Sequence, residues 1–147
     1  MILFIGTVIR SSGYDYKFYD IRFNNEYILD PTVFRDRYFP ALYSYYFRLA
    51  VNSNDKIKIE VNVLKDAVIN FKSDVCGFNS YPSDASILSG YGGSCVSNLE
   101  GLKIKGKTYS TYVYSLETSS NVNYLAVHLQ NYLALHYFSI YVHSENN

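Results

Sequence analysis

An excess of charge of either sign is absent from this sequence. Thirteen Lys and Arg residues equal thirteen Asp and Glu residues in number. Charged residues make up 18% of the 147-residue chain, below the roughly 25% of an average soluble domain. A neutral chain produces no field that would draw it to the phosphates of DNA or RNA. The composition therefore argues against a nucleic-acid partner.

Long apolar segments are missing as well. The apolar start, Met1–Ile9, is too short to span a bilayer, and it has neither the basic segment nor the cleavage site of a signal peptide. We expect it to form a buried strand that ends at Arg10–Gly13. Linkers, charge runs, internal repeats and Asn-x-Ser/Thr sites are also absent. The sequence therefore predicts one domain over residues 1–147 and no membrane span.

A sustained helical period is not found, which argues against an α/β fold. Apolar and polar residues alternate instead, most clearly at Lys56–Val63. Side chains alternate across a strand, so one set should face the core and the other should face water. The expected core set is Ile57, Ile59, Val61 and Val63, and the expected wet set is Lys56, Lys58, Glu60 and Asn62.

About ten strand candidates follow one another at intervals of about 8–12 residues, as in a β-sandwich. We therefore predict an all-β fold, an antiparallel, jelly-roll-like β-sandwich. The candidates span residues 2–9, 16–23, 26–29, 42–51, 56–63, 67–72, 101–105, 108–116, 122–130 and 134–143. The last two flank Asn131–Tyr132 and predict a hairpin. Thr32–Ala41 is the least strand-like part and is expected to be a loop or a single helical turn.

Cysteine is scarce. Cys76 and Cys95 are too few for a zinc site with four ligands, and they flank a segment rich in Ser, Gly and Tyr that we interpret as a loop. We expect a disulfide that closes this loop, with two free thiols or a metal site as the alternatives. A disulfide would indicate an exported or particle-borne protein, or the interior of a hyperthermophile.

Signatures of catalysis and of cofactor binding are missing. His128, His136 and His143 are the side chains that titrate near neutrality, and the first two would approach each other across the predicted hairpin. No serine lies in a Gly-x-Ser-x-Gly motif, and Gly90–Gly93 lacks the Lys-Ser/Thr of a phosphate loop. An Asp/Asn calcium loop is absent. We therefore expect no enzyme, no cofactor and no metal site.

Tyrosine, in contrast, is abundant, with seventeen residues. Its body is apolar and its tip is polar, and it is enriched at interfaces. Seventeen exceed what one small core needs, so we expect some to contact a protein or a sugar. The candidates are Tyr43, Tyr45, Tyr46, Tyr109, Tyr112 and Tyr114.

Three lysines alternate along one predicted strand. Lys103, Lys105 and Lys107 would place their ammonium groups on one face. Such a row binds an anionic partner, such as lipid head groups or polysaccharide, or it protects an edge strand from sheet-to-sheet aggregation. We favour edge protection.

Four strand segments carry a family resemblance. Asn54–Val63, Val68–Lys72, Tyr124–Asn131 and Tyr137–Val142 resemble strands of Golgi-dynamics-like and pre-peptidase-like β-sandwich modules, over residues 42–143. Ser119–Asn123 departs from the pattern, because a Gly usually stands before the tyrosine strand. The resemblance implies a β-sandwich and a non-catalytic part of an exported or surface protein. The composition is also similar to that of hyperthermophilic archaeal and archaeal-virus proteins.

These observations together predict a structural or interaction protein rather than an enzyme. We expect an extracellular assembly, most readily a virion or a cell-surface component, with protein partners or self-assembly. The alternative is a carbohydrate-binding module that uses exposed tyrosines. A flat tyrosine patch would indicate assembly, and an aromatic groove with adjacent Asn, Asp or Gln would indicate sugar.

Overall fold

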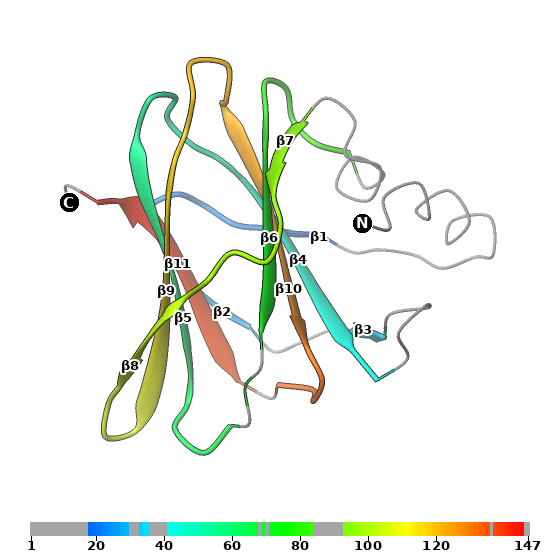
Figure 1. Ribbon diagram of the computed structural model, residues 1–147, viewed down its shortest axis with the longest axis vertical. Coiled ribbons are helices and arrows are strands. Elements are labelled where there is room, and N and C mark those ends of the chain that lie inside the picture. The colour runs from blue at the N-terminus through cyan, green and yellow to red at the C-terminus, as the bar shows by residue number, and fades with distance from the viewer. Residues whose placement is uncertain are drawn as a thin grey trace.

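The computed structural model describes residues 18–29, 33–35, 41–67, 69, 71–83, 93–135 and 137–145. Within these residues, eleven strands form two sheets that pack face to face (Figure 1). The prediction of an all-β sandwich is therefore confirmed. The strand predicted over residues 2–9 lies outside the described residues. Over the described ranges, the chain has no helix that would reach across a bilayer as an apolar span.

One sheet has six strands, in the order β1-β4-β10-β6-β7, with β3 paired to β4. All of its neighbours are antiparallel except β1 and β4, which are parallel. Its strands are β1 (Phe18–Asp20), β3 (Phe34–Arg35), β4 (Tyr43–Ala50), β6 (Lys72–Phe78), β7 (Gly93–Val96) and β10 (Tyr124–Asn131).

The other sheet has five strands, in the order β2-β11-β5-β9-β8, and every pair in it is antiparallel. Its strands are β2 (Glu26–Leu29), β5 (Lys56–Leu64), β8 (Leu102–Lys105), β9 (Tyr109–Glu117) and β11 (Phe138–Ser144). The short strands β2 and β8 are the two edges, and β5 runs through the middle.

The main core lies between the two sheets, and β5 shows how the sequence builds it. The odd-numbered side chains from Ile57 to Val63 are buried against the other sheet, as the alternation predicts. On the opposite face Lys56 is exposed, while Lys58, Glu60 and Asn62 are half-buried. They are less exposed than expected because β11 and β9 flank β5 and place side chains beside them.

The predicted hairpin at Asn131–Tyr132 is wrong. β10 pairs with β4 and β6 in one sheet, and β11 pairs with β2 and β5 in the other, so the connection between them crosses the sandwich. The backbone N–H of Leu135 in this connection donates to the Tyr45 hydroxyl at 2.7 Å, within the core. A short polar segment between two alternating segments can be the turn of a hairpin or a connection between two sheets. Only the strands that β10 and β11 pair with distinguish these two arrangements.

The segment around the first cysteine also differs from its prediction. A strand was expected at residues 67–72, but β6 begins at Lys72 and contains Cys76, and β7 contains Cys95. The two cysteines therefore lie in paired strands rather than at the ends of an irregular loop.

Candidate interaction site

The six tyrosines expected to contact a partner divide by burial. Tyr45, Tyr46 and Tyr114 are at most 3% exposed. Tyr45 and Tyr114 belong to the main core, and Tyr46 lies in a second apolar cluster on the outer side of the six-stranded sheet. Buried rings offer no surface to a partner, so the expectation is corrected for these three residues. Because tyrosine occurs on both faces of β4 and β9, residue type alone does not reveal which tyrosines face the core.

The other three tyrosines keep some exposure. Tyr43 is half-buried, and the guanidinium of Arg35 lies over its ring and donates to its hydroxyl at 2.9 Å. Tyr112 is half-buried and packs edge-to-face on Phe71. Tyr109 is 54% exposed and faces away from the core. Of the six, Tyr109 therefore offers the largest free surface.

The lysines lie at the end of the five-stranded sheet. Lys103 and Lys105 are on β8, which is an edge strand, and they are opposite core-facing positions of β9. Both are exposed, and the Lys103 ammonium lies 5.8 Å from the centre of the Tyr112 ring. Inward-pointing charge on an edge strand hinders pairing with another sheet, which supports edge protection. Lys107 lies after the strand ends, so the three do not form one row.

Exposed apolar side chains gather on the face of the five-stranded sheet that points away from the core, which we call the outer face. Residues opposite one another in register share a face, so the even-numbered positions of β5 identify their neighbours on β2, β11, β9 and β8. The large exposed apolar residues at these positions are Ile28, Leu64, Leu102, Ile104 and Tyr109, and Tyr137, just before β11, lines a hollow on the same face.

The outer face contains a hollow of about 530 Å³. This outer-face hollow lies over β2, β11, β5 and β9, and its lining residues are Glu26, Ile28, Asn62, Tyr109, Tyr137, Phe138 and Ser139. The tyrosines at its rim are well exposed, at 54% for Tyr109 and 61% for Tyr137. The hollow thus combines aromatic rings with a carboxylate, an amide and a hydroxyl.

The polar groups of the hollow form a hydrogen-bonded row across four neighbouring strands. The Ser139 hydroxyl donates to a Glu26 carboxylate oxygen at 2.7 Å and accepts from the Asn62 amide at 3.2 Å. The Thr111 hydroxyl donates to the Asn62 amide oxygen at 2.5 Å. Because strand pairing holds each residue in register, the row is preorganised before any ligand arrives.

Sequence reasoning missed most of this site. Asn62 was expected to face water, and neither Glu26 nor Ser139 nor Tyr137 was expected to take part in a binding site. The available signal was their position on predicted strands at 26–29 and 134–143. Nothing local indicates that these strands flank the same central strand, so the row appears only once the sheet is assembled.

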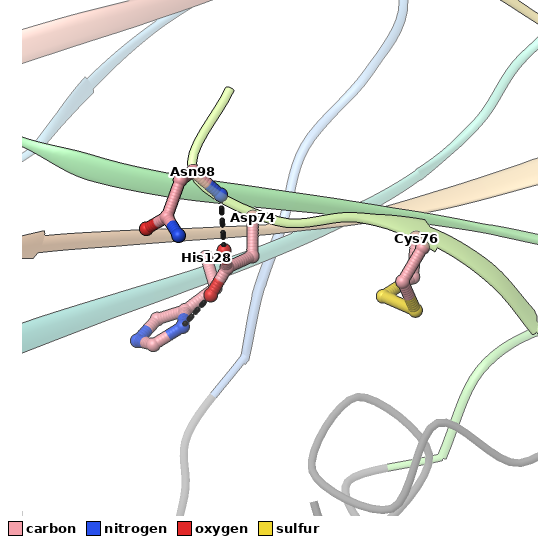
Figure 2. Close-up of a disulfide and its surroundings, with 5 residues drawn as sticks. Asp74, Cys76, Asn98 and His128 are labelled. Carbon is pink, nitrogen blue, oxygen red and sulfur yellow. Dashed lines mark hydrogen bonds and ion pairs between the residues drawn. A yellow bond between two sulfur atoms is a disulfide. The ribbon is translucent and has the colours of Figure 1, made fainter. Parts of the chain in front are cut away.

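The two cysteines form a disulfide, as predicted. Cys76 and Cys95 lie directly opposite each other on β6 and β7, 19 positions apart in the sequence (Figure 2). Cys76 is buried beside Phe78 and Ala126, whereas Cys95 is exposed. The bond therefore ties the edge strand β7 to the interior of the six-stranded sheet.

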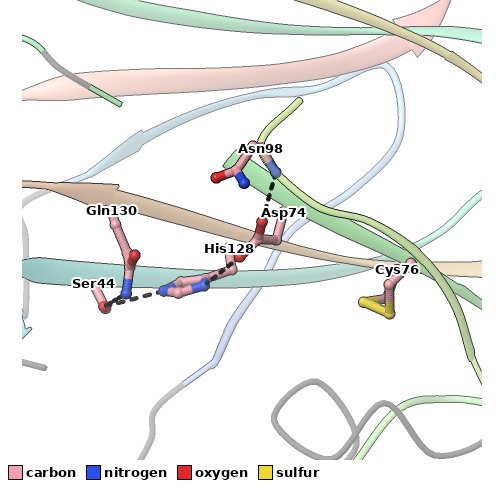
Figure 3. Close-up of polar contacts among 7 residues, drawn as sticks. Ser44, Asp74, Cys76, Asn98, His128 and Gln130 are labelled. Carbon is pink, nitrogen blue, oxygen red and sulfur yellow. Dashed lines mark hydrogen bonds and ion pairs between the residues drawn. A yellow bond between two sulfur atoms is a disulfide. The ribbon is translucent and has the colours of Figure 1, made fainter. Parts of the chain in front are cut away.

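A chain of polar groups lies two residues away from Cys76 on the same sheet face. Figure 3 shows the His128 imidazole between the Asp74 carboxylate, 3.5 Å from Nδ1, and the Ser44 hydroxyl, 3.1 Å from Nε2. The Gln130 amide donates to the same hydroxyl at 3.4 Å, and the Tyr46 ring stacks on the imidazole at 4.5 Å. Three strands, β6, β10 and β4, bring these groups together.

The order carboxylate, imidazole, hydroxyl is that of a serine-hydrolase triad. Ser44 is 1% exposed, however, and its hydroxyl is not accessible to a substrate in this structure. The group therefore acts as a buried network that satisfies polar atoms and fixes the ring of His128. His136, the expected neighbour of His128, lies outside the described residues. In the described part of the chain, no three His, Cys, Asp or Glu side chains are placed to hold a metal ion.

This network predicts that the stability of the folded state decreases at acid pH. Burial alone raises the pKa of Asp74, but hydrogen bonds from His128 and from the backbone N–H of Asn98 outweigh it, and the pKa lies below its ordinary value. The folded state thus favours the ionised form, so this stabilisation is present above about pH 4 and is lost as the pH falls further. We expect the unfolding free energy to fall less steeply below pH 4 in Asp74→Asn, measured by urea denaturation at several pH values. If the unfolding free energy of the wild type and of Asp74→Asn fell equally steeply with pH, the lowered pKa of Asp74 would be contradicted.

Comparison with known proteins shows distant structural similarity. No protein-family model and no curated protein matches the chain. Among solved structures, the chain is similar to the pre-peptidase C-terminal domain of collagenase from Bacillus anthracis, at 10% identity and a TM-score of 0.45. The similarity covers 87% of this chain and 96% of that domain. That domain belongs to the kind of module that the strand motifs resemble, but a similarity of this size bears on neither family membership nor function.

Proposed function

We propose that the chain is a non-catalytic interaction module of an extracellular assembly, either a virion or a cell surface, and that it binds its partner through the outer face. One observation carries this proposal. Of the eleven large hydrophobic side chains that are exposed among the described residues, six lie on the outer face. Three of these six, Ile28, Tyr109 and Tyr137, line one hollow, and contiguous exposed apolar surface marks interaction sites in soluble proteins.

Two further features support this function. The Cys76–Cys95 disulfide fits an oxidising setting, because disulfides persist in exported proteins and on particles. The outer face also carries exposed aromatic rings, at Tyr109 and Tyr137, and aromatic residues are enriched at interfaces. The lysines of β8 hinder strand pairing at that edge, which disfavours this edge as the contact surface.

Tyrosine footprinting in the native assembly tests the proposal without knowledge of the partner. The intact assembly and the released full-length chain are each treated with N-acetylimidazole, and acetylation of every tyrosine is measured by mass spectrometry. Tyr109 and Tyr137 should be protected in the assembly, because the partner covers the outer face. Tyr132, which is exposed but does not line the outer-face hollow, is the control and should react equally in both samples.

Two footprinting results would contradict the proposal. Equal reactivity of Tyr109 and Tyr137 in the assembly and in the released chain would contradict the outer face as the contact surface. Protection of Tyr132 with free reaction of Tyr109 and Tyr137 would contradict it as well, and would move the interface elsewhere on the protein.

A further inference from the structure

We infer that the outer-face hollow binds a neutral polysaccharide of the extracellular assembly. This inference rests on the proposed function and names the chemistry of the partner. The hollow meets the condition that distinguishes sugar binding from flat protein contact, because two exposed tyrosines stand beside an amide, a hydroxyl and a carboxylate.

The aromatic part of the site suits the apolar faces of a sugar ring. A pyranose presents C–H groups on its broad faces and hydroxyls around its edge. Tyr109 and Tyr137 offer apolar rings with polar tips, and both are exposed by more than half. Rigid aromatic side chains lose little conformational entropy on binding, so they are efficient contacts for a flat, weakly hydrophobic ligand.

The polar row suits the ring hydroxyls. The Asn62 amide has two N–H donors and uses one on Ser139, and the Glu26 carboxylate accepts from Ser139 at one of its two oxygens. The row therefore retains both a donor and acceptor positions that vicinal hydroxyls can pair with. Since its members already hold one another in place, binding does not require them to reorganise.

Charge and size narrow the ligand class. Glu26 is the charged residue among the lining residues, so its carboxylate would repel uronate, sulfate or phosphate groups. A neutral sugar avoids this cost and can donate hydroxyl protons to the carboxylate. The volume of about 530 Å³ lies within the range of roughly 300–1,000 Å³ that is typical of small-molecule sites. It therefore fits a short stretch of a polysaccharide chain.

Affinity electrophoresis of the full chain tests the inference. Native gels contain increasing amounts of dextran, mannan, xylan or mixed-linkage β-glucan, and retardation gives a dissociation constant. At least one of these neutral polysaccharides should retard the chain, whereas alginate, a polyanion, should not. Tyr109→Ala and Tyr137→Ala should each weaken binding about tenfold or more, and Glu26→Gln should weaken it without a change in side-chain size.

Matched variants and one further ligand decide the result. Tyr132→Ala should bind as well as the wild type, and urea denaturation should show that every variant is folded. The inference fails if no neutral polysaccharide retards the chain, or if Tyr109→Ala and Tyr137→Ala bind normally. It also fails if the chain binds a high-mannose glycoprotein but no free polysaccharide. Protection of Tyr109 and Tyr137 in the native assembly without polysaccharide binding would leave the proposed function standing and overturn this inference alone.

Discussion

Replacing Ile59 by alanine is expected to lower the free energy of unfolding by about 2–5 kcal/mol. Ile59 is 1% exposed and lies on the central strand of the five-stranded sheet, opposite Val142 on one side and Tyr114 on the other. The substitution removes apolar surface from the core, and neighbours held on two paired strands cannot collapse fully into the space left behind. Urea denaturation of the wild type and the variant measures the loss.

The adjacent residue provides the matched control. Lys58 lies on the same strand but on the outer face, where it is half-buried. Lys58→Ala should change the unfolding free energy by no more than about 0.5 kcal/mol, because the removed atoms are not part of the core. Comparable losses from Ile59→Ala and Lys58→Ala would mean that the strand is packed equally on both faces, against the structure described above.

Loss of the disulfide is expected to cost about 3 kcal/mol of stability in the chain-entropy model. The bond joins residues 19 positions apart, and breaking it enlarges the set of conformations open to the unfolded chain. It also frees β7, an edge strand that otherwise pairs with β6 alone. Urea denaturation of the oxidised protein with and without reductant measures this effect.

A double variant separates the disulfide from other effects of reductant. Cys76→Ala/Cys95→Ala should unfold at a lower urea concentration than the oxidised wild type, and reductant should not shift it further. Mass measurement after alkylation under denaturing conditions gives an independent check. Two alkylated thiols in the unreduced wild type, or an unchanged midpoint after complete reduction, would contradict a stabilising bond between Cys76 and Cys95.

The outer-face hollow illustrates why the site was harder to predict than the strands around it. Glu26 and Ser139 are 113 positions apart, and Asn62 and Ser139 are 77 apart, yet hydrogen bonds join them. Each is an ordinary polar residue on a strand, and none stands in a motif that indicates ligand binding. Tyr109 could be singled out by its residue type, but the same criterion selected Tyr45 and Tyr114, which are core residues.

The sequence by itself determined the all-β class, the position of most strands and the two faces of β5, because alternation is a local property of an extended chain. It also singled out the cysteine pair. Only the tertiary structure decided that β10 and β11 lie in different sheets, that Cys76 and Cys95 are cross-strand partners, and which tyrosines are buried. These features depend on which strands pair, and pairing is set by the burial of whole faces rather than by the residues next to each turn.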